Sequence, residues 1–298
     1  MRGHFGWALA SVVSVGLSGL GGALAADLPV KARPAPVVAY NWTGCYIGVN
    51  GGWKGGRFRD ESASVPATTG TIGAGTFTAP ADRIFLDSFD ANSGAAGGQV
   101  GCRWQTASNW VFGLEGDADW TDLHGTVVNR AFGTGTTFVP GDSFYNRARW
   151  EASARGIVGR SFDKLLVYGT GGVAFTQVTM GANFIQTIGT CVGGAPCIYP
   201  GSAGSDTQVL VGGTIGAGLA YALSKNWEIG AEYRYTRDQA GDFALGQVAA
   251  ICGNVSNVAV VIGCFNQNAT GHKALETNEV LFKLNYRFDS AVAVVAKY

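Results

Sequence analysis

Residues 279–288 alternate strictly between two kinds of side chain. One row is apolar and ends in aromatic residues: Val280, Phe282, Leu284, Tyr286 and Phe288. The other row is polar apart from Leu281: Glu279, Lys283, Asn285 and Arg287. A period of two predicts a β-strand rather than a helix. One row suits lipid and the other suits water or ion pairs, which is what the closing strand of a transmembrane β-barrel needs.

Seven earlier segments repeat this two-row pattern. The expected strands are residues 42–53, 93–105, 110–120, 146–162, 165–179, 209–223, 227–237 and 279–288. Their connections alternate between long and short, and the short ones lie near residues 106–109, 163–164 and 224–226. Short periplasmic turns and long outer loops are typical of outer-membrane barrels. The sequence therefore predicts an all-β fold, an eight-stranded antiparallel transmembrane β-barrel with four long outer loops and three short periplasmic turns.

Charged residues segregate to the row opposite the large apolar side chains. The expected lumen set carries both signs in similar number: Arg103, Glu115, Asp117, Asp119, Arg149, Glu151, Arg155, Glu228, Glu232, Arg234, Lys283 and Arg287. Charges inside a narrow barrel must be paired to persist. An eight-stranded barrel is about wide enough for side chains to fill it. We expect a lumen held together by ion pairs; the alternative is a narrow, charge-lined pore.

Two other architectures fit parts of the pattern. A soluble sandwich or barrel would also alternate, but its apolar row would face inward. Ten strands would result if the long connection after the first strand hides a hairpin around residues 82–86.

Composition narrows the class of protein. The chain of 298 residues has 46 glycines, which disfavours a helical fold. Aromatic residues make up 11%, which argues against disorder. The formal net charge is zero, so no attraction to nucleic acid is expected.

The two ends predict export and membrane assembly. An uncharged run after Arg2 ends in a small-residue motif, which predicts a signal peptide over residues 1–25 cleaved between Ala25 and Ala26. A transmembrane helix is the alternative. A proline-rich linker is expected over residues 26–40, the barrel over 41–288 and an apolar tail over 289–298. The aromatic residues Tyr286, Phe288 and Tyr298 are the expected assembly signal.

Six cysteines in an exported chain suggest disulfides. Cys191 and Cys197 share one long connection, and Cys252 and Cys264 share another, so local pairs are the simplest connectivity. Cys45 and Cys102 have the same outward parity on neighbouring strands. They either form a cross-strand bridge or remain two small lipid-facing residues. The cysteine spacing does not suit zinc, and no metal or cofactor is expected.

The chain resembles the small outer-membrane barrels of alphaproteobacteria, the porin-family or surface-antigen proteins, with an architecture like the OmpA membrane domain. The resemblance covers most of the chain and depends on several short motifs together. They include residues 25–29 (AADLP), 41–44 (NWTG), 168–174 (YGTGGVA), 231–233 (AEY), 284–288 (LNYRF) and 294–298 (VVAKY).

The family implies an outer-membrane location, a structural or surface-antigen role and at most narrow porin-like permeability. Outer-membrane lipid, lipopolysaccharide and the assembly machinery are the expected partners of what we expect to be a monomer, with oligomers left open. The chain departs from the family at Cys45, at Ala220, where an acidic residue is usual, and at Ile157, where a basic residue is often found. The resemblance thus implies that one lumen ion pair is missing here.

Three other functions compete with a structural role. An adhesin or ligand receptor would act through disulfide-braced outer loops. A true diffusion porin would need an open lumen. An enzyme would need a base beside a nucleophile or an activated water, and no predicted strand contains histidine, so no catalytic residue is expected.

Overall fold

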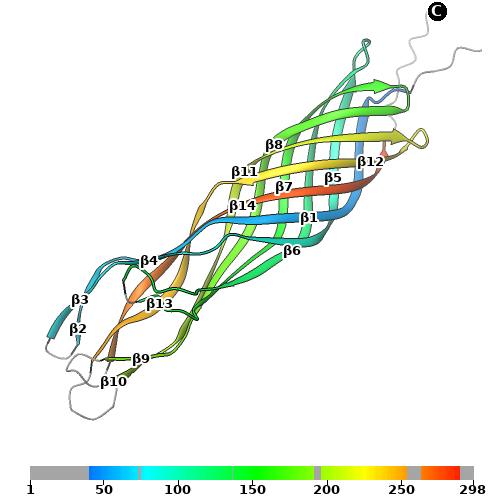
Figure 1. The fold of residues 1–298 in the computed structure, drawn as a ribbon. Helices are drawn as coiled ribbons and strands as arrows, with labels where there is room; N and C mark the ends of the chain where they lie inside the picture. The colour runs from blue at the N-terminus through cyan, green and yellow to red at the C-terminus, as the bar shows by residue number, and fades with distance from the viewer. Residues whose placement is uncertain (1–39, 73–74, 136, 191–195, 254–262, 289–298) are drawn as a thin grey trace, which may run out of the picture. The chain divides into compact units, whose positions relative to one another are not determined.

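The computed structural model describes residues 40–72, 75–135, 137–190, 196–253 and 263–288. Within them eight antiparallel strands form a closed ring, because the last strand of the series also pairs with the first (Figure 1). In chain order the strands of the ring are β1 (Gly44–Val65), β5 (Phe89–Gln105), β6 (Trp110–Val128), β7 (Ser143–Phe162), β8 (Leu165–Phe184), β11 (Ser202–Ala222), β12 (Trp227–Asp238) and β14 (Gly263–Arg287). Among the described residues, no helix is long and apolar enough to cross a membrane.

Three tight turns lie at one end of the ring, which we call the turn end. They join β5 to β6, β7 to β8 and β11 to β12. Asn109 and Asp163 have φ angles of 64° and 53° in these turns. This left-handed region is most accessible to Asn and Asp among non-glycine residues, so the turn residues match their positions.

At the other end the strands run on past their predicted limits, and we call this part the extension. For example, β8 continues to Phe184, and β14 begins at Gly263. Six further strands add to the extension: β2 (Thr68–Ile72), β3 (Gly75–Ala79), β4 (Asp82–Phe85), β9 (Thr187–Thr190), β10 (Pro196–Tyr199) and β13 (Gly241–Gly253). A strand thus exists near residues 82–86, but β4 pairs only with the outer end of β1 and is not part of the ring.

Near the turn end the outward side chains are apolar, and aromatic residues mark both edges of the apolar band. One edge carries exposed Trp104, Trp110, Trp227 and Phe288. The other edge carries exposed Trp53, Trp120 and Tyr233. Two aromatic girdles around an apolar band are the surface that a bilayer requires.

In the extension the polarity of the two faces is reversed. The inward side chains there form one apolar core, the extension core, whose fully buried members include Phe58, Leu123, Phe144, Met180, Phe243 and Leu275. On β8, buried Val178 and Met180 alternate with the more exposed Thr179. An apolar row that faces inward suits a part of the wall that is surrounded by water rather than by lipid. Burial in this core lowers the pKa of Lys273 well below its usual range.

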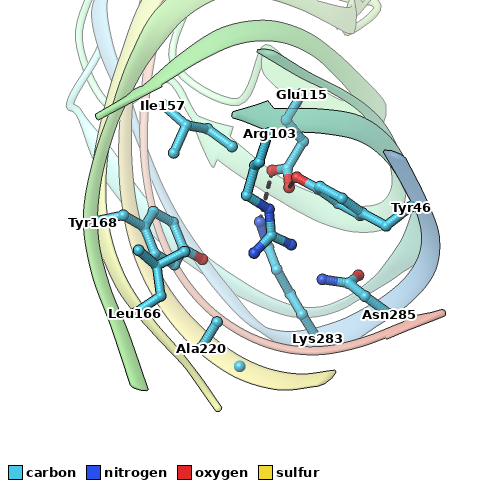
Figure 2. Close-up of a pocket in the computed structure, with 10 residues that line it drawn as sticks. Tyr46, Arg103, Glu115, Ile157, Leu166, Tyr168, Ala220, Lys283 and Asn285 are labelled. Carbon is cyan, nitrogen blue, oxygen red and sulfur yellow. Dashed lines mark hydrogen bonds and ion pairs between the residues drawn. The ribbon is translucent and has the colours of Figure 1, made fainter. Parts of the chain in front are cut away.

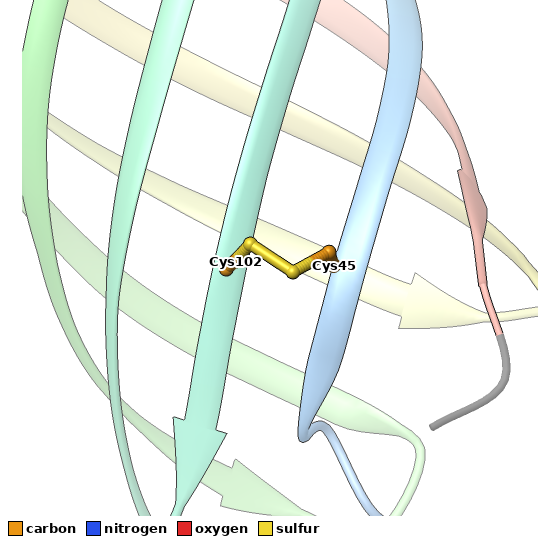
Figure 3. Close-up of a disulfide and its surroundings, with 2 residues drawn as sticks. All are labelled: Cys45 and Cys102. Atoms are coloured by element: carbon orange, nitrogen blue, oxygen red, sulfur yellow. A yellow bond between two sulfur atoms is a disulfide. The ribbon is translucent and has the colours of Figure 1, made fainter. Parts of the chain in front are cut away.

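Two disulfides brace the described chain. Cys45 and Cys102 are direct partners in the register of β1 and β5, and they are joined on the outer face of the ring (Figure 3). The same register pairs Lys54 with Ser93 near the outer end of the two predicted strands. Cys252 and Cys264 join β13 to β14. Cys191 lies outside the described residues, so the predicted Cys191–Cys197 pair stays a prediction.

Candidate functional site

The interior of the ring is the candidate functional site, and its centre is a cluster of two acids and two bases. Glu115 on β6 and Glu232 on β12 face each other across the lumen. Lys283 bridges them, with Nζ 2.8 Å from Glu115 Oε1 and 2.7 Å from Glu232 Oε2. Arg155 bridges the same two carboxylates, with Nη2 2.6 Å from Glu115 and Nη1 paired to Glu232. All four side chains are buried, so their charges are compensated by one another rather than by water.

Two tyrosines complete this central cluster. Tyr46 donates to Glu115 at 2.6 Å, and Tyr168 donates to Glu232 at 3.0 Å. Each ring lies against a glycine on the neighbouring strand. A Cβ on Gly101 would stand 2.5 Å from the Tyr46 hydroxyl, and one on Gly218 would stand 2.6 Å from Tyr168 Cζ. Glycine at these two positions therefore lets the tyrosines lie flat and reach the carboxylates.

A second group of ion pairs lies nearer the extension. Lys54 contacts Glu151 at 2.5 Å and also pairs with Glu279. Arg234 is 2.7 Å from Asp117 and 3.3 Å from Glu279. Arg234 is also 3.2 Å from Asp119. Asp119 in turn accepts a hydrogen bond of 2.8 Å from the side-chain amide of Asn50. Because Arg155 contacts Asp117 as well, this group is continuous with the central cluster.

Nearer the turn end a smaller group has a single acid. Arg103 Nη2 is 2.7 Å from Glu228 Oε2, and Arg287 Nε is 3.9 Å from Glu228 Oε1. Arg103 also stacks its guanidinium 4.1 Å from the centre of the Tyr46 ring. We call the three groups together the lumen network.

An apolar cluster, the turn-end cluster, closes the tube below the network. Its buried members are Trp42, Val111, Ile157, Leu166, Tyr168, Ala220 and Ala222. The Trp42 indole N–H donates a hydrogen bond of 3.0 Å to the carbonyl of Asp163, which fixes the indole to the turn between β7 and β8. Ile157 and Ala220, where the family resemblance implied a missing ion pair, both lie in this apolar cluster.

The space left beside the network is small. A cavity of about 10 Å³ lies between the turn-end cluster and the central cluster, lined among others by Tyr46, Tyr168, Ile157 and Lys283 (Figure 2). A volume of roughly 10–15 Å³ is what a single water molecule needs. The cavity is therefore too small for a permeating nutrient.

In the extension, one connection is tied to a single carboxylate. Asp82 on β4 accepts backbone hydrogen bonds from Gly135 at 2.6 Å, Thr137 at 2.8 Å and Phe138 at 2.9 Å. Asp82 is only 2% exposed, and Phe138 is packed into the extension core. Asp82 therefore holds the described residues around Phe138 in the β6–β7 connection against the extension core.

Most of the predicted lumen residues lie where the parity pattern put them. The buried ones are Arg103, Glu115, Asp117, Asp119, Glu151, Arg155, Glu228, Glu232, Arg234, Lys283 and Arg287. The prediction for Arg149 was wrong, since its side chain is exposed. The ladder of β7 and β8 shifts between Ala148 and Trp150, and this bulge turns Arg149 to the outer face.

The sequence reasoning missed Lys54 and Glu279 as network members. Both share the inward parity of their strands, with Lys54 four residues after Asn50 and Glu279 four before Lys283. Parity would have found Lys54 if the first strand had been extended past Trp53, and Glu279 already belonged to the polar row of residues 279–288 but was left out of the lumen set. Parity would not have identified their partners, which lie across the lumen on other strands.

The predicted end signals are only partly described. Phe288 is 53% exposed, its N–H donates to the Cys45 carbonyl at 2.9 Å, and its ring lies 5.6 Å from that of Tyr286. Tyr298, Ala25 and Ala26 lie outside the described residues, so the roles given to them stay predictions.

Comparisons with known proteins agree with this architecture. Residues 15–288 match the family described as outer membrane protein beta-barrel domain. The chain is 30% identical over 221 residues to the 31 kDa outer-membrane immunogenic protein of Brucella melitensis, covering 72% of this chain and 80% of that one. It is 26% identical over 160 residues to the 22 kDa outer membrane protein of Rhizobium leguminosarum, covering 52% and 59%.

Solved structures show more distant likenesses. OprG from Pseudomonas aeruginosa matches with a TM-score of 0.39 and 13% identity, covering 84% of this chain and 99% of that one. The protease OmpT from Escherichia coli matches with a TM-score of 0.41 and 9% identity, covering 85% and 99%. The assignment rests instead on the closed ring, the family match and the Brucella relative. The chain belongs to the outer membrane protein β-barrel family and is an integral β-barrel of the outer membrane.

Proposed function

We propose that this protein is a closed structural barrel that displays a rigid β extension at the cell surface, and that it does not work as a diffusion porin. The observation that carries the proposal is the filling of the tube at successive levels. The turn-end cluster, the lumen network and the extension core follow one another along the axis. Each level consists of described side chains packed or paired with one another, and this packing supports a tube without a continuous water path.

The proposed surface role follows from the extension. Its strands continue the barrel without a hinge, and the Cys252–Cys264 disulfide and the hairpin of β2 and β3 lie within it (Figure 1). The Brucella relative is described as an outer-membrane immunogenic protein, which fits a barrel with some part accessible from outside. An adhesin role would use the same region, where Phe85, Phe132 and Ile188 are 71–78% exposed.

Surface display predicts a difference between two epitope insertions. A short epitope between β2 and β3 is expected to bind antibody on intact cells. The same epitope in the turn between β11 and β12 is expected to bind only after the outer membrane is permeabilised. If intact cells are labelled at the turn between β11 and β12 but not between β2 and β3, the proposed orientation is wrong. The adhesin role would then be excluded as well.

We also propose that the protein has no enzymatic activity. The buried carboxylates Glu115 and Glu232 are each engaged by Arg155, Lys283 and a tyrosine, which leaves neither poised as a general base. Of the histidines that the structure describes, His124 and His272 are on the surface of the extension, with side chains 68% and 45% exposed. They are therefore remote from the acids of the lumen.

A further inference from the structure

We propose that the outer face of β6 and β7 carries a binding site for the negatively charged headgroup of an outer-leaflet glycolipid. Arg147 and Arg149 would hold the anionic group, phosphate or carboxylate, and the Trp120–Trp150 pair would lie beside the acyl chains. The proposal rests on the orientation given above, with the extension outside the cell.

The bulge in β7 is what creates the site. Arg149 has the same parity as Glu151 and Arg155, so a regular strand would point it into the lumen. Instead the ladder pairs Ala148 with Val178 and Trp150 with Gln177, and Arg149 is left over between them. Bulges often re-aim a side chain at a functional position. Here the result is an exposed guanidinium directly beside the outer aromatic girdle.

The charges at this place are not balanced by the protein. Arg147 is held by Asp122 on β6, with Nε 2.6 Å from Oδ1, and this hydrogen bond lowers the pKa of Asp122. Among the described residues, no carboxylate pairs with Arg149 within 4 Å, whereas Asp122 pairs with Arg147. Two guanidinium groups thus share one carboxylate. Arginine binds phosphate and carboxylate groups through its planar fork of donors.

The neighbouring surface suits the rest of a glycolipid. Trp120 and Trp150 are direct partners in the β6–β7 register, and Trp120 is 68% exposed in the apolar band. Beyond the arginines lies a groove of about 330 Å³ whose lining includes His124, Tyr145 and Arg147. Aromatic and polar side chains around a shallow groove are suited to a sugar. From the apolar band toward the extension, β7 would therefore contact first the acyl chains, then the anionic group and then the sugar of the glycolipid.

A second row of charges, in which Arg57 and Arg237 are exposed, provides a matched control. Arg237, Glu276, Arg57 and Asp90 are register partners across β12, β14, β1 and β5. Arg57 is 3.7 Å from Asp90, and Arg237 is 3.4 Å from Glu276. Each of these two arginines has an acidic partner within 4 Å, although Glu276 is also 2.9 Å from Arg59, whereas Arg149 has no such partner among the described residues.

The test is binding of bisphosphorylated lipid A to the full-length folded protein in a neutral detergent, measured by native mass spectrometry. The variant R147Q/R149Q is expected to bind at least about tenfold more weakly, because two charge-assisted contacts are lost. The variant R57Q/R237Q, with the same change in charge, is expected to stay within about twofold of the wild type. Arg149→Glu alone provides a second, single-site variant, and heat-modifiable gel mobility checks that each variant is folded.

Competing lipids identify the source of the anionic group. Dephosphorylated lipid A is expected to bind the wild-type protein weakly, with about the affinity that lipid A has for R147Q/R149Q. Neither phosphatidylglycerol nor inorganic phosphate is expected to displace lipid A from the wild-type protein. Equal losses in the two double variants would show unspecific attraction and overturn the site. Wild-type affinity in R147Q/R149Q and in Arg149→Glu, or equal affinity for phosphatidylglycerol, would overturn it too. Any of these results would leave the closed barrel itself intact, because that proposal is tested by conductance.

Discussion

Replacing Arg155 by methionine is expected to lower the free energy of unfolding by about 3–5 kcal/mol, the range for removing one partner of a buried ion pair. Arg155 contacts Glu115, Asp117 and Glu232, and it is fully buried. Its loss leaves Lys283 as the remaining base between Glu115 and Glu232. Urea unfolding of the protein in phospholipid vesicles, followed by the shift in gel mobility, measures the change.

The control for this prediction is Arg160→Met, the same substitution on the same strand. Arg160 is exposed on the outer face near the turn end, so its replacement is expected to change stability by at most about 0.5 kcal/mol. Adding Glu115→Gln to Arg155→Met should recover part of the loss, because it removes one of the stranded carboxylates. Similar small effects of Arg155→Met and Arg160→Met would mean that the network contributes little to stability.

The second large effect is expected from Asp82→Ala in the extension. Hydrogen bonds to a charged group contribute about 1.5–3 kcal/mol each, and Asp82 accepts three from the backbone of residues 135–138. Even with strong non-additivity, local opening should become easier by about 3 kcal/mol, or roughly a hundredfold. Limited proteolysis of the detergent-solubilised protein is expected to show faster cleavage between β6 and β7.

Asp87→Ala is the control variant for cleavage between β6 and β7. Asp87 follows β4 in the same segment and is exposed. Its removal should leave the cleavage rate at the wild-type value. If Asp82→Ala is also cut at the wild-type rate, the connection is held by its apolar contacts, such as those of Phe138 in the extension core, and not by the carboxylate.

The alternation of polar and apolar residues predicted the barrel strands, because every side chain that faces lipid has to be apolar. Strands such as residues 279–288 showed this rule directly, and the family match and the closed ring confirm the fold. The same rule failed in the extension. Val178 and Met180 keep the inward parity of Thr176, but they are apolar because that part of the wall faces water. If the apolar row is allowed to change from the outer to the inner face within one strand, the same alternation predicts strands here instead of loops.

Two features of the site could not be read from the sequence by parity. A bulge changes the face of every residue on one side of it, so Arg149 was assigned to the lumen although its side chain is exposed. Partner choice depends on distances across the lumen. Nothing along the chain indicates that Lys283 would reach Glu115 on β6 or that Lys54 would reach Glu151 on β7. Asp82 was noted only as part of a hairpin, because its backbone partners lie about fifty residues away.

Single-channel recording tests the filled tube most directly. The purified full-length protein, shown to be folded by its heat-modifiable mobility, is added to a planar lipid bilayer under an applied voltage. A lumen closed by the turn-end cluster, the network and the extension core predicts no large, stable conductance steps above the bare-lipid baseline. Large, stable steps in the wild-type protein would contradict the account, because ions could cross only if these three levels leave a continuous water-filled path.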